Sequence, residues 1–468
     1  MQISSNKSLT LFRLVMINII AVDSLRNISI TAAAGWVVIT FYLFAALFFL
    51  LPCALLTAQM ATGYAKNGGI YLWTKEAFGA RFGFITLWLQ WLYNLVWFPS
   101  ICGFFAGIIA YVVAPYFAMN PDMLVNNPWY MIIMSLCMFW LATFVNLFGI
   151  KTSSTVSIIG AVIGTLLPML IIIALALLWV LSGGHIADVP QSSDFIPSLS
   201  NVKTWGLFLT VMFSLFGLEM SSIHAANVKD PKRNFPKALL ISALVILVTL
   251  ILSNIAIFAI GSKHVQDVDI ITGLIASFRY FFAQFGIPWM SVIIALMLIL
   301  GAFTTVSAWI IGLSRAFTVA AEDGLISKQL AATNRYDAPG RVLILQGVIF
   351  SIFCLSYLLM PTVNAAYWFL SALTAQLAVI AYIGMFAAAI KLRKAKPVSL
   401  RQFLIKGGVG GTSIIAALGI AGAIVALVVG FVPTSDVRIS AYQFDVLLLL
   451  CIIVALIVPF LLIWRNKT

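Results

Sequence analysis

The sequence predicts an all-α integral membrane protein with about twelve transmembrane helices. Of its 468 residues, 63% are hydrophobic and 9% are charged, whereas about a quarter of the residues in soluble domains are charged. Apolar runs recur along the chain, and many are as long as the roughly 20 helical residues that a bilayer crossing needs. The basic residues fall mainly in alternate loops between these runs.

Hydropathy, read together with glycine, proline and charged residues, defines the individual spans. A shorter helix at 265–284 contains Asp267, Asp269 and Arg279, which suit a membrane interface better than a crossing. The first span lacks a small-residue cleavage site, so we expect it to be retained, with no soluble domain. The predicted spans are 9–35, 36–64, 80–114, 129–149, 152–182, 204–228, 236–261, 287–321, 342–360, 364–391, 411–432 and 443–464.

The distribution of charge predicts the orientation of these spans. With both termini in the cytoplasm, 22 of the 27 lysine and arginine residues lie in cytoplasmic segments, as the excess of basic residues in such loops requires. Arg26 lies within the first span. The basic residues face lipid headgroups and form no groove with interleaved aromatic residues, so we expect no nucleic-acid partner. The remaining basic residues, on the opposite side, are Lys203, Lys263, Arg279 and Arg438.

The reactive residues form no catalytic or metal-binding motif. The five cysteines lie singly in apolar segments, without metal-site spacing or a disulfide framework. We find no nucleophile with a base, no paired carboxylates and no phosphate-binding glycine motif, and the chain has three histidines. We therefore expect no enzyme, no metal and no cofactor.

Two spans are interrupted near their middle by polar or helix-weakening residues. The interruptions are AVDSLRNIS at 21–29 in the first span and SLFGLEMSS at 214–222 in the sixth. Interrupted helices at corresponding positions of two halves are typical of secondary transporters with inverted repeats and a site at the membrane midplane. We expect repeats at 1–182 and 204–391, followed by two accessory spans within 411–464.

The interruptions offer groups that suit an amino acid. The first half of a broken helix ends in free carbonyls and the second begins with free amides, which match an ammonium and a carboxylate. Arg26 could hold a substrate carboxylate through two hydrogen bonds; the alternative is a pair with Asp23 or Glu219 that locks one conformation. The residues that we expect to contact substrate at the breaks are Asp23, Ser24, Arg26, Asn27, Phe213, Ser214, Phe216 and Gly217.

Glu219 lies about fifteen residues into the sixth span, just after Gly217. A carboxylate at this depth costs about 2.5 to 3.5 kcal/mol on insertion scales and is normally partnered, protonated or functional. Our hypothesis is that Glu219 gains and loses a proton during transport or holds the broken helix together. The alternative is a carboxylate that only bonds backbone freed by the break.

Other polar and aromatic residues within the spans have two interpretations each. Trp97, Trp309 and Tyr382 lie inside their spans, where they line a substrate path or pack in the core. His224 is either a proton relay or a satisfied residue at a helix end. Thr304, Thr305 and Ser307 could bind sodium, although hydrogen bonding between helices is more typical of such residues.

A series of motifs lies in order along nearly the whole chain: GGIYLW at 68–73, AFG at 77–79, GLE at 217–219, DPKRNFP at 230–236, SAW at 307–309 and AEDGL at 321–325. Together these motifs resemble the amino acid-polyamine-organocation (APC) superfamily of permeases. Within it, the run SAWIIGLSR at 307–315 is most similar to the bacterial glutamate:GABA antiporters, and the arginine:agmatine antiporter is a more distant relative.

The resemblance implies a leucine-transporter-type fold with a 5+5 inverted repeat and broken helices 1 and 6. By motif position, Glu219 matches the family's sixth-span glutamate and Trp309 its eighth-span tryptophan near the substrate. Tyr382 falls at a tenth-span tyrosine in the path, and Arg26 at a first-span residue close to the substrate. In many relatives the first break is a Gly-Ser-Gly-like run, whereas here it is Asp-Ser-Leu-Arg-Asn, which changes the expected pocket.

The implied function is secondary active amino acid transport by alternating access, most simply exchange of an amino acid for another or for its decarboxylation product. A proton- or sodium-coupled symporter is the alternative, and an amino acid sensor without flux a remote one. We expect the protein in the bacterial inner membrane as a monomer or homodimer, with small amino acids or their amines and membrane lipid as partners. Because the chain ends at Thr468, we expect no C-terminal tail that plugs the pathway.

Overall fold

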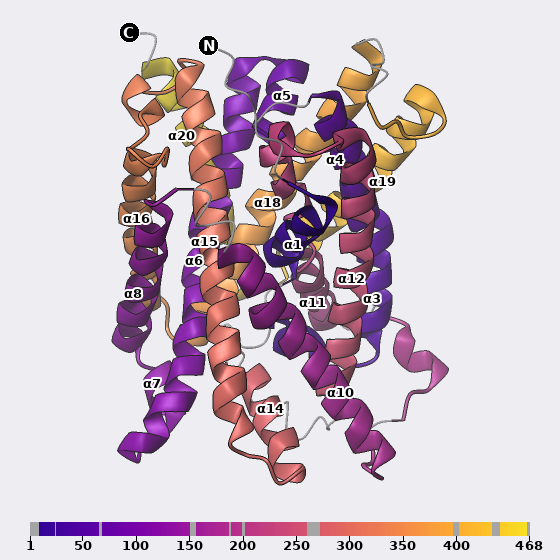
Figure 1. Cartoon of the computed structure of the whole chain (residues 1–468), viewed down its shortest axis with the longest axis vertical. Coiled ribbons are helices and arrows are strands. Elements are labelled where there is room, and N and C mark those ends of the chain that lie inside the picture. The colour runs from indigo at the N-terminus through magenta and orange to yellow at the C-terminus, as the bar shows by residue number, and fades with distance from the viewer. Residues whose placement is uncertain are drawn as a thin grey trace.

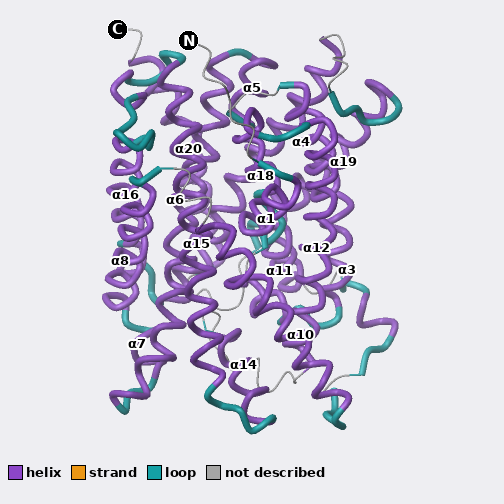
Figure 2. The backbone as a smooth tube through the Cα atoms, in the orientation of Figure 1, coloured by secondary structure: helices purple, strands orange, loops and turns teal. Residues whose placement is uncertain are grey.

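A computed structural model describes residues 9–23, 25–64, 68–149, 156–186, 189–198, 202–259, 272–395, 402–432 and 440–465. These residues form a bundle of long helices (Figure 1), and the backbone between them consists of loops and turns (Figure 2). Within the described residues, 12 helical segments are long and apolar enough to cross a membrane, which confirms the predicted fold class.

The twelve crossing segments agree with the twelve predicted spans, one in each. Several are built from consecutive helices: the third span adds the 3-10 turn η3 (Ala114–Phe117) to α6, and the second and fifth contain the π-helical turns η2 (Ala46–Leu50) and η4 (Gly160–Leu166). The segments are Leu11–Ala32, Val37–Gly63, Ala80–Phe117, Pro128–Asn146, Val156–Leu181, Thr204–Ile223, Pro231–Ala259, Met290–Glu322, Gly340–Leu359, Val363–Ala395, Gly408–Val429 and Ala441–Ile463.

The individual helices follow from this division. Their bounds are α1 Leu11–Val22, α2 Ile28–Ala32, α3 Val37–Ala45, α4 Leu51–Gly63, α5 Ile70–Phe78, α6 Ala80–Val113, α7 Pro121–Val125, α8 Pro128–Asn146, α10 Leu167–Leu181, α11 Val202–Phe213, α12 Pro231–Ala259, α14 Gly273–Gln284, α15 Met290–Glu322, α16 Gly340–Cys354, α17 Ser356–Leu359, α18 Val363–Ala395, α19 Gly408–Val429 and α20 Ala441–Arg465. Short 3-10 helices are η1 Leu25–Asn27, η5 Ser192–Phe195, η6 Leu218–Asn227 and η7 Lys328–Ala331.

Two short helices lie outside the crossing segments. The interface helix predicted at 265–284 is present as α14, and Asp267 and Asp269 lie outside the described residues. The helix α5, which connects the second and third spans, was not predicted because it carries Lys75 and Glu76 and lies between two glycine-containing loops.

Sequence signals at the ends of the bundle explain where helices begin. The side chain of Asn127 accepts hydrogen bonds from the backbone N–H groups of Trp129 (2.9 Å) and Tyr130 (3.3 Å), and Pro128 occupies the first helical position of α8. Both features satisfy or remove the amide donors that a helix leaves unpaired at its start.

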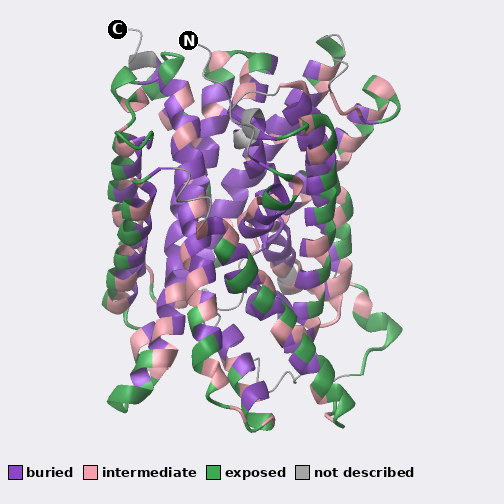
Figure 3. Cartoon of the chain, in the orientation of Figure 1, coloured by how far each residue is buried: buried purple, intermediate pink, exposed green. Residues whose placement is uncertain are grey.

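Burial divides the helices into a core and an outer layer (Figure 3). The spans that contain α1, α6, α11, α15 and α18 are largely buried, whereas fewer than half of the residues in those of α8, α16, α19 and α20 are buried, as expected of lipid-facing helices. α6 packs against both α15 and α18. The two interrupted spans are therefore surrounded by protein.

Small residues allow close contact within the core. The backbones of Gly164 and Gly301 meet so closely that a Cβ at Gly301 would lie 2.2 Å from the carbonyl oxygen of Gly164. Small residues at such crossings permit the packing that holds membrane helices together. The fifth span is thereby fixed against α15.

The described residues form an even number of crossings, so the first crossing begins and the last one ends at the same end of the bundle. We call this end, which carries α5, the terminal end, and the end that carries α7 and α14 the opposite end (Figure 1).

Candidate functional site

The first predicted interruption is present in the structure. α1 ends at Val22, Asp23 adopts an extended conformation with ψ of 97°, and helical structure resumes in η1. The backbone N–H of Asp23 donates to Ile19, and the carbonyls that follow Ile19 have no helical continuation to accept from. Ser24 lies outside the described residues.

The second interruption depends on a glycine. α11 ends at Phe213, residues 214–217 form turns, and η6 begins at Leu218. Gly217 has φ of 111°, which residues with a side chain rarely adopt. A Cβ at this position would lie 2.7 Å from Cζ2 of Trp309 and 2.9 Å from the carbonyl oxygen of Ala21. The glycine therefore allows the two interruptions to touch.

Trp309 joins the two interruptions to α15. Its indole Nε1 donates to the carbonyl oxygen of Ala21 at 3.1 Å, and its ring packs against Gly217. Trp309 is 4% exposed, so one of the free carbonyls of α1 is satisfied by a buried donor.

A small cavity of about 30 Å³ lies beside the interruptions. One buried water molecule needs at least about 10 to 15 Å³, so this conformation is closed to anything the size of an amino acid. The lining includes Asp23, Asn27, Phe213, Phe216 and Trp309, which were expected to contact substrate, and Trp97, which was considered for a substrate path. The other lining residues are Ile20, Ala21, Val22, Tyr93, Asn94 and Thr305.

Asp23 and Asn27 are polar groups of the cavity wall with unused acceptors. Thr249 of α12 donates its hydroxyl to Oδ2 of Asp23 at 3.1 Å. Oδ1 of Asp23 and Oδ1 of Asn27 have no hydrogen-bond partner among the described residues. Both side chains are 2% exposed, so two buried acceptors face the interruption.

Arg26 lies outside that cavity lining and is 1% exposed. Its Nη1 donates to the hydroxyls of Ser100 and Ser371, the latter at 3.4 Å. Its guanidinium carbon lies 5.3 Å from the ring centre of Phe213 and 5.0 Å from that of Tyr367. Nε and Nη2 have no hydrogen-bond partner among the described residues.

The intramolecular pairs considered for Arg26 are not formed. Lys75 pairs with Asp323 and Arg315 with Asp337, and no ion pair joins Arg26 to Asp23 or Glu219, which all lie in the described part of the chain. Arg26 is instead held by hydroxyls and aromatic faces, which are neutral groups. Its charge is therefore buried without a carboxylate partner in the described part of the chain.

Glu219 is held by neutral donors from two other helices. The hydroxyl of Tyr382 donates to Oε2 at 2.6 Å, and Nε2 of Gln90 donates to Oε1 at 3.1 Å. The same Tyr382 oxygen accepts from the backbone N–H of Gly217 at 2.8 Å. Glu219, at the break in the sixth span, therefore accepts hydrogen bonds from side chains of α6 and α18. A carboxylate that bonded only the freed backbone would make neither contact.

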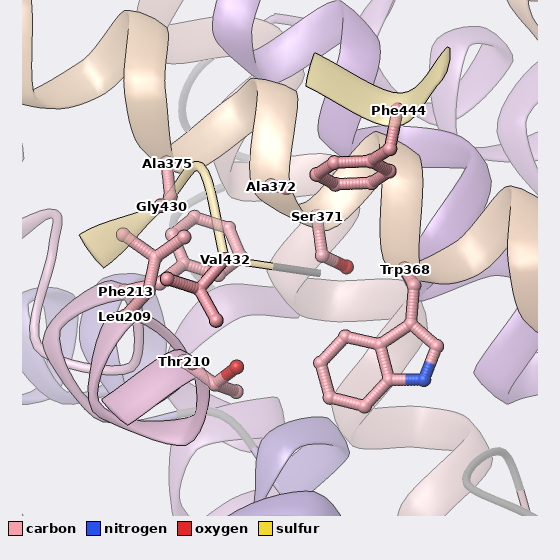
Figure 4. A pocket seen from close by; sticks show the side chains of 11 residues that line it. Leu209, Thr210, Phe213, Trp368, Ser371, Ala372, Ala375, Gly430, Val432 and Phe444 are labelled. Atoms are coloured by element: carbon pink, nitrogen blue, oxygen red, sulfur yellow. The ribbon is translucent and has the colours of Figure 1, made fainter. Parts of the chain in front are cut away.

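A second small cavity lies beside Phe213 (Figure 4). It lies on the opposite-end side, because most of its lining comes from the first halves of the spans that contain α11 and α18, which both begin at that end. Side chains of Thr210, Trp368 and Ser371 face it, from α11 and α18. Phe213 lines both cavities, and Ser371 is also a hydrogen-bond acceptor for Arg26. Arg26 therefore lies where the two cavities are separated.

A larger pocket, of about 340 Å³, lies toward the terminal end. It is lined by Ile223 of η6 and by residues of α15 beyond Trp309, including Arg315. Between Trp309 and Arg315 along α15, a Cβ at Gly312 would lie 2.6 Å from Cε of Met220, which precedes Ile223 in η6. Met220 therefore packs against α15 between the residue that lines the closed cavity and the residue that lines the terminal-end pocket.

Besides Arg26, three predicted site residues lie near the cavity without lining it. Ser214 is occupied by hydrogen bonds with Tyr42 (3.1 Å) and with the carbonyl of Val211 (2.7 Å). Gly217 packs against Trp309, and Tyr382 bonds Gly217 and Glu219. The side chain of His224 lies outside the described part of the chain.

The structure adds Tyr93 and Asn94 to the cavity wall, which also includes Thr305. Thr305 donates to the carbonyl of Gly301 at 2.9 Å, in line with the hydrogen-bonding interpretation of the α15 hydroxyls. A signal for the α6 residues is present in the sequence: Gln90, Asn94 and Trp97 recur at helical spacing in an apolar span.

Comparison with known proteins identifies the family of the chain. Residues 9–458 match the amino acid permease family. An uncharacterized transporter of Legionella pneumophila is 44% identical over 98% of this chain and 97% of its own length. A glutamate/gamma-aminobutyrate antiporter of Lactococcus lactis is 30% identical over 90% of this chain and 83% of its own.

A probable agmatine/putrescine antiporter of Lactococcus lactis is 24% identical over 82% of this chain and 79% of its own length. These relatives are membrane transporters and not enzymes. The described residues include 12 helical segments long and apolar enough to cross a membrane, and the chain belongs to the amino acid permease family of the APC superfamily.

Proposed function

We propose that this permease is an antiporter that exchanges an acidic amino acid for another amino acid or for its decarboxylation product. The substrate binds between the two interruptions, where Asp23, Asn27, Phe213, Phe216 and Trp309 line the cavity. The free carbonyls at the end of α1 accept from the substrate ammonium, as helix C-terminal ends can for cations.

The observation that carries this proposal is the unpaired charge of Arg26. A guanidinium with 1% exposure and neutral partners lies beside the cavity, and burying a charge without a partner is strongly unfavourable. A substrate carboxylate that reaches Arg26 would supply the missing charge through a charge-assisted hydrogen bond. Movement of Phe213, which separates Arg26 from the central cavity, would permit that contact.

Exchange is favoured over symport by the relatives. The Lactococcus lactis proteins of 30% and 24% identity carry the names of antiporters, for glutamate and gamma-aminobutyrate and for agmatine and putrescine. The first pair is an acidic amino acid and its decarboxylation product. The buried arginine of this chain suits the acidic member of such a pair.

Transport by alternating access requires the site to open to each side in turn. We propose that residues 1–182 and 204–391 form inverted repeats, with 411–464 as accessory spans, and that the interrupted helices move against the rest. In this view Phe213 closes the opposite-end side and Met220 with Trp309 closes the terminal side. Glu219, bonded to two other helices, exchanges a proton or changes partners as the bundle moves.

Reconstituted liposomes test the proposal directly. Vesicles preloaded with unlabelled amino acids or amines are assayed for uptake of radiolabelled glutamate, gamma-aminobutyrate and neutral and cationic amino acids. We expect uptake of the acidic substrate that depends on internal substrate. Uptake into empty vesicles driven by a proton or sodium gradient would instead establish a symporter, and saturable binding without flux a sensor.

The role of Arg26 is tested in the same assay. Removing a hydrogen bond to a charged group costs about 1.5 to 3 kcal/mol, so we expect Arg26→Ala to raise the half-saturating concentration of the acidic substrate about tenfold or more. Ser371→Ala is the matched control, since it removes only a 3.4 Å contact and keeps the charge. Equal affinities for acidic and neutral substrates in both wild type and Arg26→Ala would contradict direct recognition.

A further inference from the structure

An open pocket of about 440 Å³ lies at the opposite end of the bundle, away from the interruptions. It is formed by the end of α6, by η3, by the interface helix α14 and by the start of α15, the arrangement visible around α14 in Figure 1. Its wall includes Tyr111, Tyr116, Arg279, Ala283 and Ser291. None of these residues lines the cavity at the interruptions.

Arg279 is the cationic group of this pocket. Its guanidinium carbon lies 5.5 Å from the ring centre of Tyr111, a cation–π distance that fixes the side chain over an aromatic face. No ion pair joins Arg279 to another residue in the described part of the chain. A planar guanidinium held in this way is well suited to bidentate binding of a phosphate.

The position of Arg279 is unusual for this chain. With the termini in the cytoplasm, it is one of only four basic residues on the opposite side among 27. Insertion disfavours basic residues there. Arg279 therefore does not belong to the general charge that orients the protein.

The surroundings of the pocket are those of a membrane interface. Tyr116, Phe117 and Trp289 are 78%, 70% and 62% exposed and lie at the ends of the helices that form it. Exposed aromatic residues concentrate at the level of lipid headgroups. A phosphate at Arg279 would thus lie at headgroup depth.

An apolar track leads from the pocket along α15. Trp289, Val292, Ile293 and Leu296 recur at helical spacing, and all are at least 40% exposed. They face outward from the bundle, toward the hydrocarbon of the bilayer. A molecule that is held at Arg279 and extends along this track needs an anionic head and long apolar chains.

We infer that this pocket binds the headgroup of an anionic glycerophospholipid. Arg279 holds the phosphate, Tyr111 positions the guanidinium, and an acyl chain lies along the exposed face of α15. The lipid would connect α14 to α6 and α15, which meet at this end of the bundle. Free phosphate shares the head chemistry but cannot use the apolar track.

Native mass spectrometry of the purified full-length protein tests this inference. Phosphatidylglycerol is titrated into protein stripped of lipid, and the bound fraction is measured for wild type and Arg279→Ala. Losing a charge-assisted contact near the surface should lower the apparent affinity about fivefold or more. Arg279→Lys, which keeps the charge without the planar fork, should lose less. Inorganic phosphate at millimolar concentration should not displace the lipid.

Two further variants separate the pocket from general charge. Lys203→Ala removes another basic residue of the same side, at the start of α11, and should bind phosphatidylglycerol like wild type. Ala283→Trp fills the pocket from an exposed position and keeps Arg279; it should weaken binding with an unchanged unfolding temperature. Equal affinity of wild type, Arg279→Ala and Ala283→Trp would overturn the inference, as would displacement of the lipid by inorganic phosphate.

Discussion

Tyr382 makes two hydrogen bonds that connect the second interruption to its surroundings. Its hydroxyl donates to Glu219 and accepts from the backbone N–H of Gly217. One side chain of α18 therefore satisfies both the carboxylate and the amide that the break exposes. Removal of either partner leaves a buried polar group unpaired, which costs about 1 to 3 kcal/mol.

We predict that Tyr382→Phe lowers both the unfolding temperature and the exchange rate, because it leaves the backbone N–H of Gly217 without its acceptor and removes one hydrogen bond to Glu219.

Glu219→Gln keeps the size of the side chain and should slow exchange while making the exchange rate less dependent on pH. The two changes should be non-additive by about 0.5 to 3 kcal/mol, as for residues in one network. A Glu219→Gln protein with the rate and pH dependence of wild type would exclude a protonation role.

Gly217 gives a further prediction at this scale. In Gly217→Ala the new Cβ meets Trp309 and the Ala21 carbonyl at 2.7 and 2.9 Å, at φ of 111°. Conformational strain of this kind costs about 1 to 3 kcal/mol, and the clash should also abolish exchange. Gly183→Ala is the control, since Gly183 has φ of 92° and a methyl group added there would meet nothing within 4 Å. Comparable losses in both variants would assign the effect to backbone strain alone.

Sequence reasoning identified the residues at the interruptions but not their partners. Asp23, Asn27, Phe213, Phe216 and Trp309, which were expected to contact substrate, line one small cavity, because a broken helix exposes neighbours in sequence to one space. Their part in substrate binding stays a prediction. Arg26 could not be placed from sequence. Its hydroxyl partners lie 74 and 345 residues away, and such non-local contacts depend on how whole helices pack.

At the scale of elements, α5 is joined to the end of α15. Lys75 Nζ lies 2.6 Å from Oδ2 of Asp323, and the hydroxyl of Tyr71 donates to the same oxygen. Tyr71 and Lys75 are four residues apart and share one face of α5. This contact joins the connection between the second and third spans to the end of the eighth span.

The charge of this contact is sensitive to acid. Partial burial would raise the pKa of Asp323, but hydrogen bonds and the charge of Lys75 outweigh it and lower that pKa below its usual value. Burial and the nearby Asp323 raise the pKa of Tyr71. A carboxyl whose pKa is lower in the folded state stabilises the fold above its unfolded pKa of about 4, and this contribution disappears as pH falls through the folded value.

We therefore predict that Asp323→Asn unfolds at a lower temperature than wild type at neutral pH and that the difference shrinks as pH falls below about 4. Thermal unfolding in detergent across this range measures both. Asp337→Asn removes the other ion pair of the terminal end, in which the carboxylate is 76% exposed, and should have a smaller effect. A difference between wild type and Asp323→Asn that is constant with pH would contradict the assignment.

The elements themselves were largely predictable because membrane crossing imposes a length and a composition. All twelve spans and the interface helix α14 were located from apolar runs and charges. The short helix α5 has no such constraint, since it is held by Asp323 and by contacts with α6 and α18. Asp323 is remote from α5 in sequence, and the helix contacts depend on how the bundle packs in three dimensions.

For the whole molecule, the charge distribution gives an energetic reason for orientation. Basic residues near an anionic membrane surface contribute about 1 kcal/mol each, and 22 of 27 lie in segments on the side of the termini. Because the first crossing begins and the last one ends at the terminal end, we predict that this end faces the cytoplasm. Tyr116, 78% exposed in η3, and Tyr336, 42% exposed between η7 and α16, then lie on opposite sides of the membrane.

Single cysteines at these two positions, in a variant with the five native cysteines replaced, test the orientation. A membrane-impermeant maleimide applied to intact cells should label Tyr116→Cys and should label Tyr336→Cys only after permeabilisation. Both positions are exposed in the same structure, so each serves as the accessibility control for the other. The reverse pattern would place the termini outside, and the Arg279 pocket would then face the cytoplasmic leaflet, where its basic residue would no longer be exceptional.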